Sequence, residues 1–99
     1  MLTVFDSQTA NAISRAFALS ADKTTRDNKD GERVIVPSGV FDGATLTVQV
    51  SANGVDFSDM ATNVLTKAQA EIVYLPNELH VRGVLAGVGA STDVNLHIV

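Results

Sequence analysis

Residues 44–51 read Ala44-Thr45-Leu46-Thr47-Val48-Gln49-Val50-Ser51, with apolar and polar side chains in alternation. Because successive side chains of an extended chain point to opposite sides, this pattern predicts a β-strand with its leucine and valines on a buried face. The pair Asn53-Gly54 follows at once and favours a tight type I′ hairpin turn, since both central residues of that turn need positive φ. We therefore predict a hairpin whose return strand covers residues 55–60.

Similar short runs occur elsewhere in the chain. The other predicted strands are 33–37, which ends at Pro37, then 63–66, 70–75, 79–86 and 93–99. In the last of them, Val94, Leu96 and Ile98 alternate with polar residues and are expected in the core. No lysine or proline interrupts this terminal strand, so we predict that it is an open edge that pairs with another chain.

Two segments fit a helix as well as a strand. Residues 8–19 place apolar side chains at helix-like spacing, but the same residues support a strand over 15–20, and the β neighbours favour the strand. Residues 66–70 have the composition of one helical turn. Short strands about every 8–12 residues predict an all-β protein. Specifically, we expect residues 1–99 to form a single β-sandwich, jelly-roll-like, of seven or eight mostly antiparallel strands.

The N-terminal third is expected to be less regular than the sandwich core of residues 34–99. Residues 22–33 hold eight of the eighteen charged side chains of the chain and no apolar one. We interpret residues 1–33 as an extended arm and charged loop that become ordered against a neighbouring protein. On this view Arg26, Lys29 and Arg33, together with Phe41, are candidate partner-binding residues.

Part of the charged loop resembles a calcium-binding loop. The run Asn28-Lys29-Asp30-Gly31 has the right start, but Arg26 stands where an oxygen ligand is needed and Pro37 stands where a glutamate is needed. A charged turn is therefore the favoured interpretation. A looser calcium site that uses Asp27 and Asp30 is the alternative.

The residue types that carry catalysis are poorly placed for it. The chain has no cysteine, which excludes disulfides, thiolate zinc sites and cysteine nucleophiles. His80 and His97 lie on the strands before and after the 87–91 loop, and if those strands pair, the two imidazoles could share a zinc ion, although two ligands alone make a weak site. Asp56 and Asp59 lie beside a hairpin with no sign of a pocket. We expect no enzyme activity and no cofactor.

The charge and composition of the chain indicate which kinds of partner to expect. The net charge is −4, with seven basic and eleven acidic residues, and a nucleic-acid binder normally presents a basic face. Neither a signal-peptide pattern nor a membrane-spanning apolar run is present. We therefore expect no nucleic-acid and no membrane partner. Charged residues make up 18%, below the usual quarter, which favours a homo-oligomer with part of its surface covered.

Residues 36–99 resemble small structural proteins of tailed-bacteriophage particles. The resemblance is carried by the step Phe41-Asp42-Gly43-Ala44-Thr45 into the alternating strand, by the turn Ser51-Ala52-Asn53-Gly54 with Phe57 soon after it, and by the strand, glycine loop and terminal strand of residues 79–99. It implies a virion component made in the host cytoplasm: a capsid decoration or cement protein that binds the major capsid protein. A head–tail, tail or fibre module is implied as an alternative. Such proteins have no catalytic residues and often form trimers.

A second class of function stays open. A module that recognises a glycan or a host surface would present an exposed aromatic side chain or a calcium site. Phe41 and Tyr74 are the candidate aromatics, because the other three aromatic residues alternate with polar neighbours as core residues do. Asp27 and Asp30 are the candidate calcium ligands.

Overall fold

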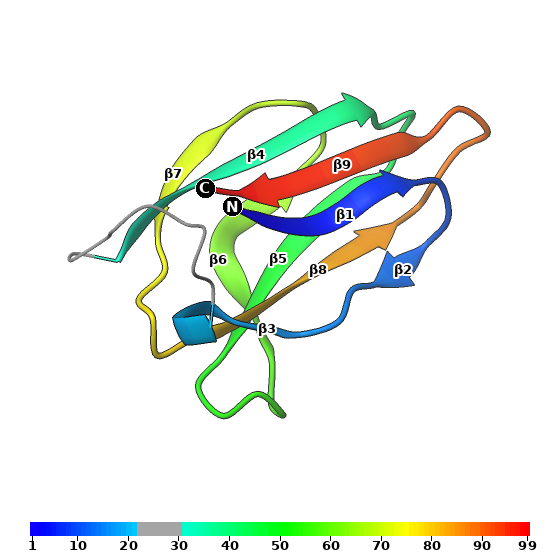
Figure 1. Ribbon diagram of the computed structural model, residues 1–99. Helices are drawn as coiled ribbons and strands as arrows, with labels where there is room; N and C mark the ends of the chain where they lie inside the picture. Colours follow the sequence, from blue (N-terminus) through cyan, green and yellow to red (C-terminus); the bar gives the residue numbers. More distant parts are fainter. Residues whose placement is uncertain (22–30) are drawn as a thin grey trace.

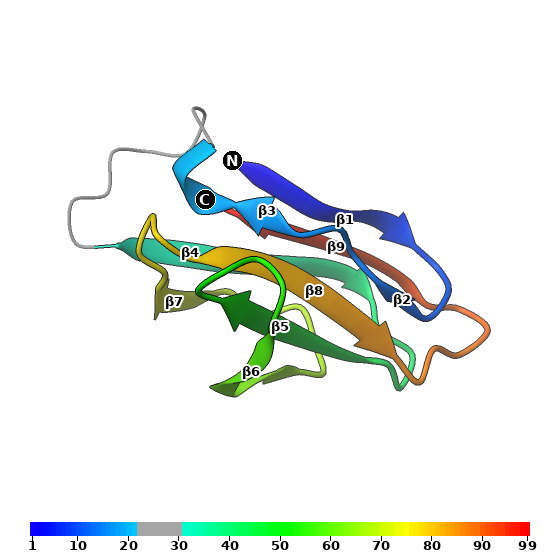
Figure 2. The same cartoon turned by 90° about the horizontal axis from the view of Figure 1, so that it is seen from below.

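The computed structural model describes residues 1–21 and 31–99, and for residues 21 and 61–63 it describes the backbone alone. Within this part of the chain, two antiparallel sheets pack face to face (Figures 1 and 2), which confirms the predicted all-β sandwich. The strands are β1 (Leu2–Gln8), β2 (Ala12–Ile13), β3 (Phe17–Ala18), β4 (Glu32–Val40), β5 (Thr45–Ser51), β6 (Ser58–Leu65), β7 (Glu71–Tyr74), β8 (His80–Ala86) and β9 (Asp93–Ile98), and one 3-10 turn, η1, covers Leu19–Ala21.

The two sheets are built from strands that are distant in the sequence. Sheet A has the order β1-β9-β4-β7, and sheet B has the order β2-β8-β5-β6, with β3 also paired to β8. The inward faces of both sheets form one hydrophobic core. Its fully buried members include Ile35, Leu46, Val48, Val81, Leu85, Val94, Leu96 and Ile98. Burying one such aliphatic side chain stabilises the fold by about 1.5–3 kcal/mol.

The terminal strand β9 is not an edge, so that prediction is wrong. Ile98 lies opposite Leu2 of β1 on one side and opposite Ile35 of β4 on the other. The predicted inward side chains of β9 are nevertheless confirmed, since all three are at most 1% exposed. Among the strands that the structure describes, β1 and β7 are the edges of sheet A.

The first 21 residues belong to the sandwich and do not form an arm. β1 closes one side of sheet A, and β2 and β3 both pair with β8 in sheet B. Phe5, Phe17 and Leu19 are buried in the core, which anchors this segment. The strand predicted over 15–20 is present only as the two residues of β3, and η1 follows it. Between β2 and β3, the backbone nitrogen of Ser14 donates to the backbone oxygen of Gly83.

β4 runs through Pro37, where a strand end was predicted. Val34 and Val99 form a pair that exchanges two backbone hydrogen bonds. Hydrogen-bonded and non-hydrogen-bonded pairs alternate along antiparallel strands, so Pro37 and Leu96, three positions further along, form a pair without hydrogen bonds. The nitrogen of Pro37 therefore points away from β9, toward the side of β4 where β7 pairs no further than Ile35. The strand loses no ladder hydrogen bond at the proline, which is why it continues.

The β5–β6 hairpin is confirmed, but its loop has a different structure from the predicted two-residue turn. Val50 pairs with Ser58, so residues 52–57 form the loop, and Val55 is 78% exposed within it. The Asn53 Oδ1 accepts hydrogen bonds from the backbone nitrogens of Val55 and Asp56, both at 2.9 Å. The side chain of Asn53 thus replaces a backbone carbonyl in closing the turn. Residues 66–70, expected as a helical turn, form bends without a helix.

Replacing Asn53 by alanine is expected to lower the free energy of unfolding by about 1 kcal/mol, because two backbone N–H groups lose their acceptor. Equilibrium unfolding in urea measures the change. Asn53→Asp is the matched control, since a carboxylate keeps an acceptor at the same place and should retain most of the stability. An Asn53→Ala protein as stable as the parent would contradict this role of the side chain.

Candidate interaction surface

The outer face of sheet A carries a group of apolar side chains that the fold does not bury. Val99, Val34 and Ile72 form one row across the sheet, because Val34 pairs with Val99 on one side and with Ile72 on the other. Tyr74 lies beside this row on β7. The exposed fractions are 36% for Val99, 69% for Ile72 and 66% for Tyr74, while Val34 is half-buried. We call these four residues the outer patch.

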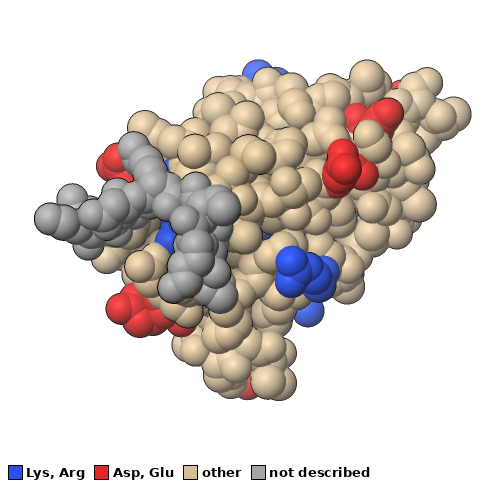
Figure 3. All heavy atoms as spheres, in the orientation of Figure 1, with Lys and Arg blue, Asp and Glu red and all other residues tan. Residues whose placement is uncertain are grey.

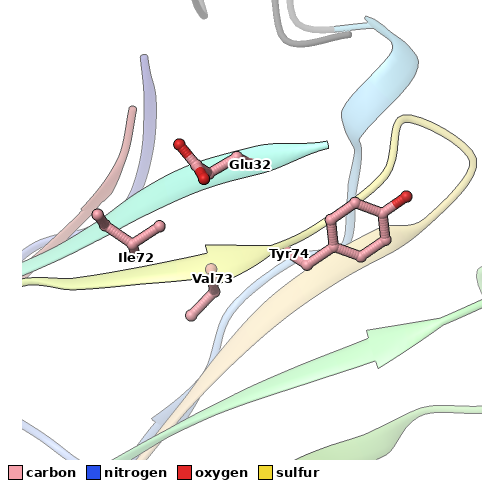
Figure 4. A pocket seen from close by; sticks show the side chains of 4 residues that line it. All are labelled: Glu32, Ile72, Val73 and Tyr74. Carbon is pink, nitrogen blue, oxygen red and sulfur yellow. The ribbon is translucent and has the colours of Figure 1, made fainter. Parts of the chain in front are cut away.

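The patch is hollowed at β7. Glu32, Ile72, Val73 and Tyr74 line an open depression (Figure 4). Ile72 and Val73 point to opposite sides of the strand, with Ile72 on the outer face and Val73 packed against the core. Three of the four residues that line the depression are apolar or aromatic, and the fourth, Glu32, places one carboxylate at its border.

The backbone of β7 is open along the side away from β4. The backbone nitrogen of Leu75 donates a hydrogen bond to the backbone oxygen of Gly31 at 2.6 Å. By antiparallel alternation, the backbone N–H and C=O groups of Val73 and Glu71 therefore also point toward β4. The N–H and C=O groups of Ile72 and Tyr74 then point outward, and no described residue lies beyond β7 in sheet A. The same two residues thus expose both their side chains and their backbone groups.

The other sheet edges are interrupted. β1 shows register shifts on both sides of Phe5, and the β5–β6 pairing is irregular between Thr47 and Gln49. β2 and β3 have two residues each. Bulges and short strands are common devices that prevent edge-to-edge association. Within the described residues, β7 has no bulge, because its four residues pair with β4 without a register shift.

The outer face of sheet B is organised by polar contacts. The Arg82 Nε donates to the Gln49 Oε1 at 2.7 Å, and the Gln49 Nε2 donates to the Asp59 Oδ1 at 2.8 Å. The guanidinium of Arg82 also lies 4.1 Å from the centre of the Phe57 ring. These groups satisfy one another across β8, β5 and β6. Two exposed apolar side chains, Ile13 and Val64, lie on the same face, each 62% exposed.

Charged side chains are sparse on the side that Figure 3 displays, where they form small, separate groups on a mostly uncharged surface. This view agrees with the low charged share of the sequence. No large field of one sign is visible on this side, so apolar and hydrogen-bonding contacts, not charge, would dominate an interface there.

Two of the predicted partner-binding residues are buried. Arg33 is 2% exposed, and its Nε donates to the backbone oxygen of Leu75 at 3.0 Å while its Nη2 donates to the Asn77 Oδ1. Phe41 is 6% exposed and belongs to the core. Their predicted place at an exposed contact surface is corrected, because both side chains hold the fold together. The other predicted residues, Arg26, Lys29, Asp27 and Asp30, lie outside the described residues.

The two histidines do not meet. His80 is on β8 in sheet B and His97 is on β9 in sheet A, so the strand pairing needed for a shared zinc ion does not occur. Within residues 1–21 and 31–99, no group of three or more His, Asp or Glu side chains is arranged to hold a metal ion. Asp56 and Asp59 accept hydrogen bonds from different residues, Asn53 and Gln49.

Sequence reasoning identified Tyr74 as a candidate exposed aromatic, and the structure exposes it. It missed Ile72 and the open edge of β7. The run Ile72-Val73-Tyr74 is continuously apolar, so periodicity alone did not show which of its side chains face outward. Only the pairing with β4 decides this.

Comparison of the chain with protein-family models, with curated proteins and with solved structures gives no match. In the part of the chain that the structure describes, no helix has the length and apolar character needed to cross a bilayer.

Proposed function

We propose that this chain is a non-enzymatic structural protein of a bacteriophage particle, most specifically a capsid decoration or cement protein that binds the major capsid protein. The observation that supports this proposal best is the outer patch on a rigid sandwich. Exposed contiguous apolar surface on a small domain marks a site of association with another protein. The sequence resemblance of residues 36–99 to phage structural proteins supplies the virion context. Proteins of that kind often form trimers, so a homo-oligomer is the state that the proposal expects.

The physical demands of such a protein fit this domain. A protein that stabilises a capsid surface must keep its shape under load and offer a flat contact face. The central strands of sheet A, β9 and β4, are paired on both sides, and their inward side chains are fully buried. Their outward side chains, among them Val34 and the nearby Val36, present a β-sheet surface on which another protein can pack.

The proposal is tested by co-sedimentation of the purified chain with capsids assembled from the major capsid protein of the phage genome that encodes the chain. We expect saturable binding, and we expect Val34→Lys to weaken it at least tenfold, because a charge in the centre of a buried contact is costly. Val64→Lys, on the outer face of sheet B, is the control and should bind like the parent. No sedimentation with capsids at any concentration would refute the decoration role. Binding to purified tails instead would indicate the head–tail or tail alternative.

A second candidate, a glycan- or host-surface-binding module, is favoured by one observation. Tyr74 is 66% exposed and borders the depression beside Glu32, and an aromatic ring next to a polar group is a usual arrangement for stacking on a sugar. Screening an array of bacterial surface glycans tests this candidate. Binding that disappears in Tyr74→Ala but persists in Val34→Lys would support it over the decoration role.

A further inference from the structure

We propose that β7 pairs with β7 of a second copy of this chain, antiparallel and around a two-fold axis, so that two four-stranded sheets A become one continuous eight-stranded sheet. This inference concerns self-association and does not depend on the virion role. It rests on the geometry of Ile72, Val73 and Tyr74.

The backbone of β7 determines the register. The outward N–H and C=O groups belong to Ile72 and Tyr74. An antiparallel neighbour forms hydrogen bonds only with residues whose groups point toward it. The register that uses both outward residues of the four-residue strand places Ile72 opposite Tyr74 of the second copy, and Tyr74 opposite its Ile72. Each of these two pairs exchanges two hydrogen bonds, and Val73 lies on the two-fold axis between them.

The side chains agree with this register. Ile72 and Tyr74 both stand on the outer face, so each tyrosine ring meets the isoleucine of the second copy, an aromatic–β-branched pair that stabilises sheets. Glu71 would lie opposite Leu75 of the second copy, not opposite its own equivalent. The pairing therefore joins the apolar parts of the two edges without placing like charges directly opposite each other.

A second copy is favoured over an unrelated strand because the edge is complementary to itself. One four-residue strand supplies both halves of the contact, which is the requirement for a closed two-fold interface. Among the described strands of sheet A, β7 is the open edge without register shifts, and closure would remove it. Two-fold pairing predicts a dimer or another even-numbered assembly, which differs from the trimer that the phage resemblance implies.

Single-cysteine variants test the register directly, since the chain has no cysteine of its own. In the proposed pairing the two Val73 Cα atoms lie about 4.5 Å apart, within the range that a disulfide bridges. The two Ile72 positions are offset by two residues and fall beyond about 7 Å, which is too far. Under mild oxidation we expect at least tenfold more disulfide-linked dimer from Val73→Cys than from Ile72→Cys. Val64→Cys controls for random collision, because Val64 is 62% exposed and lies on sheet B.

A second variant covers the case in which cysteine at position 73 disturbs packing. Ile72→Pro removes the outward N–H but leaves the hydrogen bonds to β4 in place, as proline permits on an edge strand. Sedimentation velocity should show the parent at twice the 10.4 kDa monomer mass and this variant at the monomer mass, with its dimer dissociation constant raised at least tenfold. A trimeric or monomeric parent, or Ile72→Cys that crosslinks as readily as Val73→Cys, would overturn the proposal. Capsid co-sedimentation is a separate readout, so either proposal can fail alone.

Discussion

Replacing Gly39 by alanine is expected to lower the free energy of unfolding by about 3–5 kcal/mol. Gly39 lies in β4 opposite Val94 of β9 and has a φ of 98°, which side-chain-bearing residues rarely adopt. A Cβ atom at this position would also lie 2.1 Å from the backbone oxygen of Asp93. Because that oxygen is part of the neighbouring strand, it cannot move aside as a flexible side chain would. The variant should therefore lose much of the roughly 5–15 kcal/mol by which a domain is stable.

The Gly43→Ala variant separates the two causes of this loss, which are the backbone strain at positive φ and the close contact with Asp93. Gly43 has a similar φ of 83°, but an added Cβ would have no atom within 4 Å. It should therefore show only the backbone strain, about 1–2 kcal/mol. Urea unfolding of both variants, monitored by circular dichroism, gives the difference, which measures the contact with Asp93. Equal losses in the two variants would show that the close approach of β4 and β9 at Gly39 relaxes without cost.

The strands were predictable where their side chains alternate. β5, β8 and β9 follow the period-two pattern, and their inward residues Leu46, Val81 and Leu96 are buried as this pattern predicts. The order of the strands was not predictable in the same way. Alternation indicates that a strand has a buried face but does not say which strands flank it, so β9 was expected at an edge and lies between β1 and β4.

The candidate surface was harder to predict than the fold. Tyr74 was identified because a chain with five aromatic residues offers few alternatives. Arg33 was assigned to the exposed loop because it ends a charged run, but its position depends on Leu75 and Asn77, more than forty residues further along the chain. Contacts of such separation leave no local pattern in the sequence. The same limit applies to the open edge of β7, which is defined by its pairing with β4.

Substitution of Arg33 is expected to affect stability and not partner binding. Arg33→Met keeps the length and apolar stem of the side chain but removes its donors, so the backbone oxygen of Leu75 and the Oδ1 of Asn77 each lose a hydrogen bond. Leu75 is fully buried, which makes water a poor replacement for the lost donor. Hydrogen bonds from a charged donor contribute about 1.5–3 kcal/mol each, so we expect a total loss of about 3–6 kcal/mol for the two bonds. Chemical unfolding measures this loss.

The Arg33→Lys variant distinguishes the contribution of the two directed hydrogen bonds from that of the positive charge. A lysine keeps the positive charge but places it at one point, so it cannot donate in two fixed directions as the guanidinium does. We expect it to recover less than half of the stability lost in Arg33→Met, because the charge itself is not what Leu75 and Asn77 require. At temperatures where the variants are folded, both should co-sediment with capsids like the parent. If Arg33→Met is as stable as the parent and fails to bind capsids, the guanidinium acts on a partner and its role in the fold is minor.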